Sequence, residues 1–504
     1  MTQRRLSSII LCLVVIAFPA LAAPIQSIRL VTPNDQPLPN ARELDRTLQT
    51  HLAKEITDDE LGVLADIVVD HLHRHHWPVS LVTVWDEDDG LAQGRVTLQV
   101  QQGKIGDIAV LGGTPQRQLT VARKMADLRG APLDALALQR RLDALAFSSW
   151  LAVTPQVVPG PTLDTANLAL TLRDVSPFSA FASYENNGVE PLGENRYTLG
   201  IEWLNAFALG HDLIFATSIA DDPETLSVFA GSYRALLPWR HELRLSGYYA
   251  ESESTADILG IPLDVAGTTW ATSARYVIPW RVSEQWRSEW SLGFDLKQFD
   301  NQFTFGDISS APETAGVGTV VLGTQWFYDK DQNHARFALE AAHGHEGWAD
   351  GQTAHIYNDF TPGASPTFTY IRADTACQHD FKNDFQANLR LSGQWSDGPL
   401  LASEELSIAS VNAVRGYPER SIRASRGAWA SLEARSPSWK GFRAIAFTDC
   451  GYIADDSSEH DFIASTGLGI RGEITKHFQL RAELAFPLVD GDEPRVHLAA
   501  VVRF

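Results

Sequence analysis

The residues best suited to specific chemistry lie in the C-terminal third of the chain, and that chemistry is charge-assisted binding rather than catalysis. An arginine and a carboxylate form a strong bidentate pair, and a glycine beside the arginine allows tight backbone geometry. Alternation over residues 442–451 places Asp449 on one face of a strand. A pairing of Arg415 with Asp449 is one interpretation of these residues; the other, which alternation alone favours, is a surface arginine and a lumen-facing carboxylate that never meet. The stretches concerned are Ser403-Glu404-Glu405, Val414-Arg415-Gly416-Tyr417-Pro418-Glu419 and Phe447-Thr448-Asp449-Cys450-Gly451.

Other groups of polar residues are weaker candidates for a metal site. A zinc site needs at least three ligands with supporting contacts, and a calcium loop needs regular acidic spacing. The sequence has no GxSxG, P-loop, GxGxxG or HExxH motif. We therefore predict neither an enzyme nor a cofactor or metal site, and interpret these groups as solvated. They are His71, His73, His75 and His76; His343, His345 and Glu346; and residues 86–89.

The N-terminus has the three parts of a secretory signal peptide, which we assign to residues 1–22. Arg4 and Arg5 precede an apolar run, and Ala20-Leu21-Ala22 supplies small residues for cleavage. The formal net charge of −21 argues against binding to nucleic acid. Beyond this segment no run of 18 apolar residues exists, which excludes a helical membrane protein. A soluble exported protein and an outer-membrane β-barrel remain.

Residues 24–175 alternate helical and strand patterns in two copies of one arrangement. The order β-α-α-β-β occupies residues 24–101 and restarts over residues 102–175. Within the first copy, Thr57 and Glu60 have the spacing of a capping box at a helix N-terminus. We expect two small α+β domains in tandem.

From residue 177 to residue 504 the chain alternates apolar and polar residues in strand after strand. A soluble β-sandwich would alternate too. The expected strands, however, are ten to thirteen residues long, close to the 9–11 residues that cross a bilayer at a tilt, and Trp and Tyr gather at their ends. We predict an all-β transmembrane barrel of sixteen antiparallel strands. They start near residues 178, 195, 211, 225, 240, 266, 285, 317, 333, 366, 384, 427, 441, 463, 477 and 495.

Four long gaps between these strands are predicted to be extracellular loops: 253–265, 300–316, 345–365 and 398–426. The last contains Arg415 and far exceeds a hairpin turn. A loop of this length can fold back into the barrel lumen, where Arg415 would reach Asp449.

These features together resemble the ShlB/FhaC/HecB family of two-partner secretion transporters within the BamA superfamily. The family has a signal peptide, two POTRA domains and a sixteen-stranded barrel. Its VRG(F/Y) loop motif matches Val414, Arg415, Gly416 and Tyr417, and its F-x-D-x-G strand motif matches Phe447, Asp449 and Gly451. The resemblance therefore implies that Arg415 pairs with Asp449. Phe504 is similar to the terminal aromatic residue that barrel assembly machinery recognises.

The resemblance implies a function and a set of partners. The chain would translocate an unfolded partner exoprotein through its pore (type Vb secretion) after periplasmic POTRA domains bind this TpsA-like client. Its other partners would be outer-membrane lipid and the barrel assembly machinery. One alternative is a BamA/TamA-like assembly factor, although such proteins usually carry three or more POTRA domains. Another is a passive porin, which would leave both motifs unexplained.

One departure from the family concerns the pore. Well-known members place a plug helix before the first POTRA domain. Here the first expected strand begins about three residues after the predicted cleavage site, so no such helix fits between them. We therefore expect the 398–426 loop to supply more of the closure.

Overall fold

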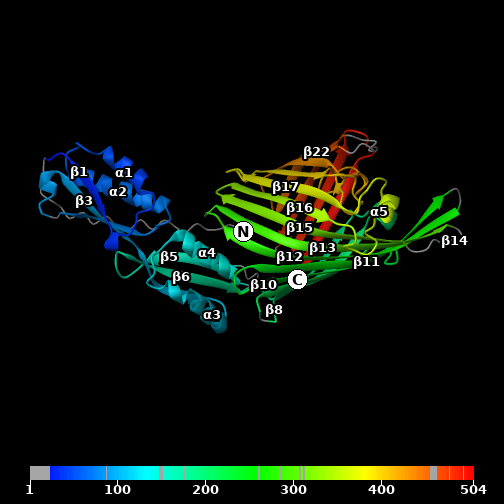
Figure 1. Ribbon diagram of the computed structural model, residues 1–504, viewed down its shortest axis with the longest axis horizontal. Coiled ribbons are helices and arrows are strands. Elements are labelled where there is room, and N and C mark those ends of the chain that lie inside the picture. The colour runs from blue at the N-terminus through cyan, green and yellow to red at the C-terminus, as the bar shows by residue number, and fades with distance from the viewer. Residues whose placement is uncertain are drawn as a thin grey trace. The chain divides into compact units, whose positions relative to one another are not determined.

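The computed structural model describes residues 23–504 except 87, 147–150, 175, 208, 259–260, 284, 306–307, 310–312, 455–461, 476 and 492. The predicted signal peptide, residues 1–22, lies outside the described residues. The chain divides into two compact units, one before residue 176 and one comprising Ser176–Phe504 (Figure 1). Within the described residues, no helix is both long and apolar enough to cross a membrane.

The first unit contains the same arrangement twice. Each copy has a three-stranded sheet in which the first strand runs parallel to the central third strand and the second strand runs antiparallel to it. This confirms the predicted tandem of α+β, POTRA-like folds. The elements are β1 (Ser27–Val31), α1 (Ala41–Gln49), α2 (Asp58–Arg74), β2 (Ser80–Trp85) and β3 (Arg95–Gln102), then β4 (Lys104–Leu111), α3 (Pro115–Met125), α4 (Ala135–Ala146), β5 (Leu151–Pro159) and β6 (Thr165–Asp174). Short 3-10 turns occupy Pro33–Asp35, Leu91–Gln93, Ala126–Leu128 and, in the second unit, Glu190–Leu192.

Helix α2 shows how the sequence starts and buries such an element. The Thr57 side chain accepts a hydrogen bond from the Glu60 backbone N–H at 3.1 Å, which satisfies one of the donors left open at a helix N-terminus. The Glu60 carboxylate, predicted to complete a capping box, instead pairs with His51 and Lys54. The helix buries Leu61, Leu64, Val68 and Leu72 against the sheet.

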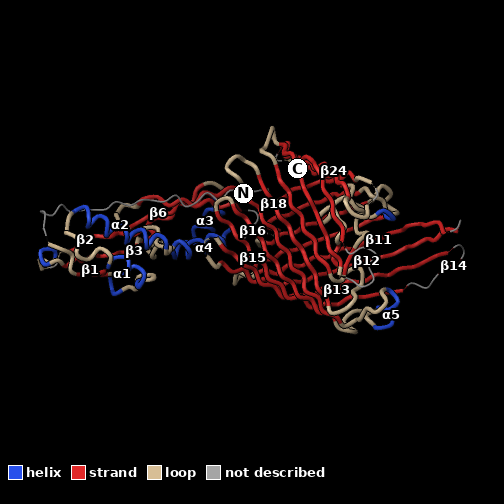
Figure 2. Tube along the Cα trace, turned by 90° about the horizontal axis from the view of Figure 1, so that it is seen from above, coloured by secondary structure: helices blue, strands red, loops and turns tan. Residues whose placement is uncertain are grey.

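The second unit is a closed barrel (Figure 2). It consists of sixteen antiparallel strands, as predicted. The pairing runs through consecutive strands, and β25 returns to β7 over Ala499–Arg503 and Phe181–Glu185. The strands are β7 (Phe178–Glu185), β8 (Arg196–Ala206), β9 (His211–Ile219), β10 (Leu226–Leu236), β11 (Glu242–Ile258), β12 (Ile261–Arg281), β13 (Trp286–Phe305), β15 (Glu313–Lys330), β16 (Asn333–Gly344), β17 (Phe368–Asp380), β18 (Gln386–Ser396), β21 (Gly427–Arg435), β22 (Phe442–Ile453), β23 (Phe462–Thr475), β24 (Phe478–Pro487) and β25 (Arg495–Arg503); a two-residue β14 (Ile308–Ser309) pairs with the end of β13.

Period-two alternation explains why these segments form the wall. In β24, Leu484 and Phe486 are exposed on the outside, whereas Glu483 and Ala485 are buried on the inside. A barrel surrounded by lipid needs this apolar outer face and tolerates a polar interior. The inward-facing polar residues are therefore the ones available to hold a loop inside the lumen.

The prediction of loops at 253–265 and 300–316 is wrong, because the described residues of both segments are mostly strand. Residues 253–258 continue β11 and pair with β12, although the pairing of β10 with β11 ends at Leu226 and Ser252. The 300–316 segment likewise contains the ends of β13 and β15. The sequence there lacks apolar alternation, but hydrogen-bonded strands require it only where one face meets lipid or a core.

The 345–365 segment is a loop that carries α5 (Ala354–Phe360) and packs against the first residues of β15, where the Tyr357 hydroxyl donates to the Gly316 carbonyl at 3.0 Å. Pairing between β15 and β16 ends at Thr319 and Gly344. Beyond that point the Gln352 side chain accepts from the Gly318 N–H at 2.8 Å and donates to the Gly318 carbonyl at 3.3 Å. A side chain thus replaces the missing neighbour strand at this position.

Candidate functional site

The segment between β18 and β21 is a compact loop whose apolar side chains pack against the inner wall of the barrel. Its ends pair through β19 (Leu406–Ser407) and β20 (Arg423–Ala424). Ile408, Val414 and Tyr417 are buried in one cluster with residues of β22 and β23. The 398–426 loop therefore lies against β22, which carries the strand motif, and against its neighbour β23.

Gly451 explains why the strand motif ends in glycine. A Cβ atom at this position would lie 2.4 Å from Ile408 and 3.1 Å from Val414. Such contacts are closer than packed atoms allow. The missing side chain at Gly451 therefore leaves the space that the loop occupies.

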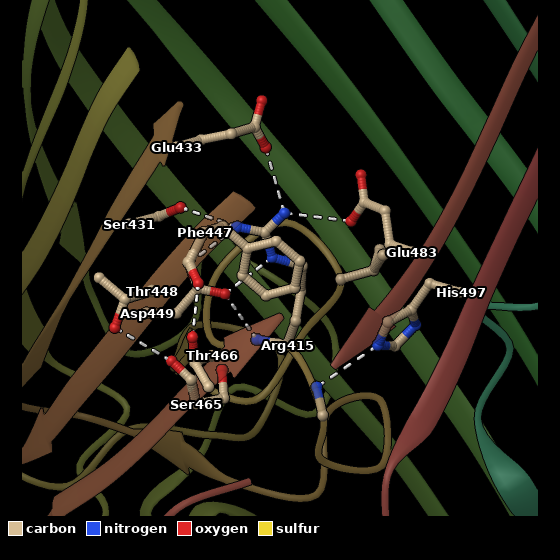
Figure 3. Close-up of polar contacts among 12 residues, drawn as sticks. Arg415, Ser431, Glu433, Phe447, Thr448, Asp449, Ser465, Thr466, Glu483 and His497 are labelled. Carbon is tan, nitrogen blue, oxygen red and sulfur yellow. Dashed lines mark hydrogen bonds and ion pairs between the residues drawn. The ribbon is translucent and has the colours of Figure 1, made fainter. Parts of the chain in front are cut away.

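Arg415 is fully buried and forms a bidentate pair with Asp449 of β22 (Figure 3). Its Nε donates to Asp449 Oδ2 at 2.7 Å and its Nη2 donates to Oδ1 at 2.8 Å. The Arg415 backbone N–H also donates to Oδ2 at 3.2 Å. The structure thus brings together the two charges that the sequence analysis linked.

The Arg415 guanidinium also contacts residues that the sequence analysis did not identify. Nη1 donates to Glu433 of β21 at 3.2 Å and to Glu483 of β24 at 3.1 Å, and Nη2 donates to Ser431 of β21 at 3.2 Å (Figure 3). Burial alone lowers the pKa of Arg415, but the hydrogen bonds and charge of Asp449, followed by those of Glu483, raise it above its ordinary value. Arg415 is therefore a permanent cation.

The two glutamates have further cationic partners. Arg471 of β23 donates to Glu433 at 2.9 Å and to Glu483 at 2.9 Å, and Arg435 donates to Glu433 at 2.7 Å. Asp449, on β22, is the third carboxylate that contacts Arg415. The loop arginine is thus held by an extended ionic network rather than by one isolated pair.

The aromatic residue of the strand motif completes the pocket around the cation. The Arg415 guanidinium carbon lies 3.3 Å from the centre of the Phe447 ring, a cation–π contact. Phe447 is buried and its ring fits over Gly467 on β23, where a Cβ atom would lie 2.2 Å from the ring. The motif phenylalanine therefore packs on one side against the loop and on the other against its neighbouring strand.

Gly416 and Tyr417 continue the loop motif with contacts of their own. Gly416 has φ +92°, which favours glycine, and its N–H donates to His497 Nε2 at 3.4 Å. Tyr417 donates to the carbonyls of Ala464, at 2.9 Å, and Val489. The four motif residues therefore contact strands from β21 to β25 or the segment joining β24 to β25.

Phe504 lies apart from this site. This residue is 74% exposed, and its backbone N–H donates to the Ala180 carbonyl of β7 at 2.8 Å. The structure thus places Phe504 at the junction between the last and first strands. Its predicted role in barrel assembly stays a prediction.

The weaker metal candidates have other contacts. His71 Nε2 bonds to the Pro39 carbonyl at 2.8 Å, and His75 Nδ1 bonds to the His71 carbonyl at 2.8 Å. His343 Nδ1 bonds to Thr369 at 3.0 Å. In the part of the chain that the structure describes, no group of three or more His, Cys, Asp or Glu side chains is arranged to hold a metal ion.

Comparison with known proteins agrees with this architecture. The family model described as haemolysin secretion/activation protein ShlB/FhaC/HecB matches residues 164–472, more than half of the chain. The heme/hemopexin transporter protein HuxB of Haemophilus influenzae (strain 86-028NP) is 20% identical over 404 residues, which cover 78% of this chain and 69% of that protein.

Two solved structures share the fold over nearly the whole chain. CdiB from Escherichia coli aligns with a TM-score of 0.78 at 15% identity and covers 100% of this chain and 94% of its own. CdiB from Acinetobacter baumannii aligns with a TM-score of 0.70 at 17% identity and covers 97% and 91%. At these identities the structural matches show the fold alone.

Proposed function

Because the chain belongs to the ShlB/FhaC/HecB family of haemolysin secretion/activation proteins, we propose that it exports a partner exoprotein through its barrel. The observation that carries this proposal is the loop held inside the barrel by Arg415 and Asp449. A barrel whose interior holds a loop at a polar anchor has a pathway and a means of closing it. In this proposal the loop motif and the strand motif are the parts of the transporter that control passage.

We further propose that the first unit receives the client in an extended form. In each three-stranded sheet the second strand lies at an edge, where β2 packs beside α2 and β5 beside α4. An extended segment binds such an edge by adding a strand, and the main-chain hydrogen bonds supply affinity. This mode of binding requires little specific sequence, which suits a client that has not yet folded.

The proposed location follows from the same features. The barrel would lie in the outer membrane with its apolar outer face in lipid, and the POTRA-like unit would lie in the periplasm. Phe504 would be the residue that the barrel assembly machinery recognises. Translocation would draw its driving force from folding of the client outside the cell, since the chain contains no nucleotide-binding motif.

The experiment that tests this function compares culture medium and outer membrane from cells with and without the chain. We expect one large protein to disappear from the medium and to return when the chain is supplied again. Levels of other outer-membrane barrels should not change. If those barrels decline instead, the chain assembles outer-membrane proteins, as the BamA/TamA-like alternative holds.

A further inference from the structure

Glu404 lies in the same loop as Arg415, and its contacts with the barrel wall carry an inference beyond the loop motif. We propose that Glu404 is a second anchor, which fastens the loop to the wall away from the Arg415 network. Glu404 would be a positioning residue for pore closure, so the proposal rests on the function proposed above. The 398–426 loop would then be fixed to the barrel wall at two points, Arg415 and Glu404.

The carboxylate of Glu404 is buried against charged and polar residues of the wall. The Glu404 residue is 2% exposed. Lys297 of β13 donates to Oε1 at 2.7 Å, and the Tyr370 hydroxyl of β17 donates to Oε2 at 3.4 Å. Ser403, its neighbour in the loop, also donates to Oε1 at 2.9 Å. A carboxylate with this burial is stable only because it has such partners.

The backbone of Glu404 is fastened as well. Its carbonyl accepts from Arg372 Nη2 of β17 at 3.2 Å and from Gln394 Nε2 of β18 at 3.0 Å. Gln394 also donates to the Ser425 carbonyl at 3.3 Å, at the other end of the loop. The wall therefore holds the loop at this point through both main chain and side chain.

The two anchors use different strands and opposite charges. Arg415 reaches the acidic residues of β21, β22 and β24, whereas Glu404 reaches the basic and polar residues of β13, β17 and β18. β13 and β17 are separated by β15 and β16 in the barrel order. Glu404 therefore holds the loop to the part of the wall that ends at β18, and Arg415 holds it to the part that begins at the neighbouring strand β21.

Two anchors of opposite sign have a mechanical consequence. If Arg415 alone is released, the part of the loop around Glu404 remains fixed to β13 and β17, and the reverse also holds. Full opening requires both contacts to break. A client entering the pore would have to displace both, and loss of either anchor should make opening more frequent.

The test compares Glu404→Gln with Glu405→Gln in the full-length protein inserted in planar bilayers. Glutamine keeps the size of the side chain but removes the charge that faces Lys297. Glu405 is the matched control because it pairs with Arg423 within the loop, at 3.6 Å. Heat-modifiable migration checks that each variant forms a barrel.

We expect Glu404→Gln to raise the frequency of large-conductance openings by about tenfold or more, because each factor of ten corresponds to about 1.4 kcal/mol and loss of one partner of a buried ion pair costs at least that much. Glu405→Gln should change it far less. The exchanged pair Lys297→Glu with Glu404→Lys should bring the frequency back toward the original value.

The proposal is overturned if Glu404→Gln forms a barrel but opens no more often than the original protein. It is also overturned if Glu405→Gln has the same effect, because the loop would then respond to any lost charge. These readings need no client. Absence of an exported partner in cells would therefore reject the proposed function while the result for the second anchor would stand.

Discussion

Replacing Arg415 by alanine should release the 398–426 loop from the acidic residues of the barrel wall without preventing insertion of the barrel. The guanidinium has three carboxylate partners, but they would not suffer equally. Glu433 keeps Arg435 and Arg471, and Glu483 keeps Arg471. Asp449 would retain, of the contacts described for it, the hydrogen bond from the backbone N–H of residue 415.

The cost of the change therefore comes mainly from one buried carboxylate. Removing one partner of a buried ion pair costs about 3–5 kcal/mol, much of it from the charge left behind. At about 1.4 kcal/mol for each factor of ten, the population of released loops should rise by about a hundredfold or more. Arg415→Lys should release the loop more often than the original protein does but less often than Arg415→Ala, because lysine keeps the charge but loses the bidentate geometry.

The assay combines single-channel recording with measurement of partner protein in the culture medium, and heat-modifiable migration controls for folding. Arg415→Ala should open more often and export less. Adding Asp449→Asn to Arg415→Ala should reduce the excess opening, because no uncompensated carboxylate then remains. Normal closure and normal export by a correctly inserted Arg415→Ala variant would refute the reasoning. So would a double variant that is more open than Arg415→Ala.

Three further predictions concern other parts of the chain. Deleting residues 412–422 should markedly raise single-channel conductance and admit large antibiotics; unchanged conductance would mean that another segment, such as 345–365, closes the pore. Deleting residues 24–101 should abolish binding of the client's N-terminal region while conductance persists, and undiminished binding would place recognition elsewhere. Thr57→Ala should weaken α2 by about 1 kcal/mol, measured as faster amide hydrogen exchange in that helix, and equal exchange in both proteins would contradict the cap.

The strands were predictable because lipid and a polar interior impose alternation on nearly every segment of the wall. The end of β11 and the start of β12 were not predictable, because outside the part of the barrel that meets lipid neither face of a strand has to be apolar. Residue type and alternation only allowed Arg415 to pair with Asp449, and the resemblance of the two motifs to the family made the pairing an expectation. Alternation also places Glu433 and Glu483 inside the barrel, but it cannot say which inward charges meet, since that depends on strand tilt and stagger.

Glu404 illustrates the same limit at longer range. Its position in a charged stretch was visible, but Lys297 lies 107 residues earlier in the chain. Only the closed barrel brings β13 within reach of the loop. Contacts between distant segments of this kind follow from the fold and leave no local pattern in the sequence.

The closure of the barrel by β25 and β7 has a consequence for the order of folding. The other strand pairs join segments that follow one another in the chain, whereas this seam pairs residues such as Ala499 and Glu185. Asn186 strengthens it by donating to the Val496 carbonyl and accepting from the Leu498 N–H. Local hairpins close at little entropic cost, and distant pairings close late. The seam should therefore form last, when the rest of the wall has already brought its two edges together.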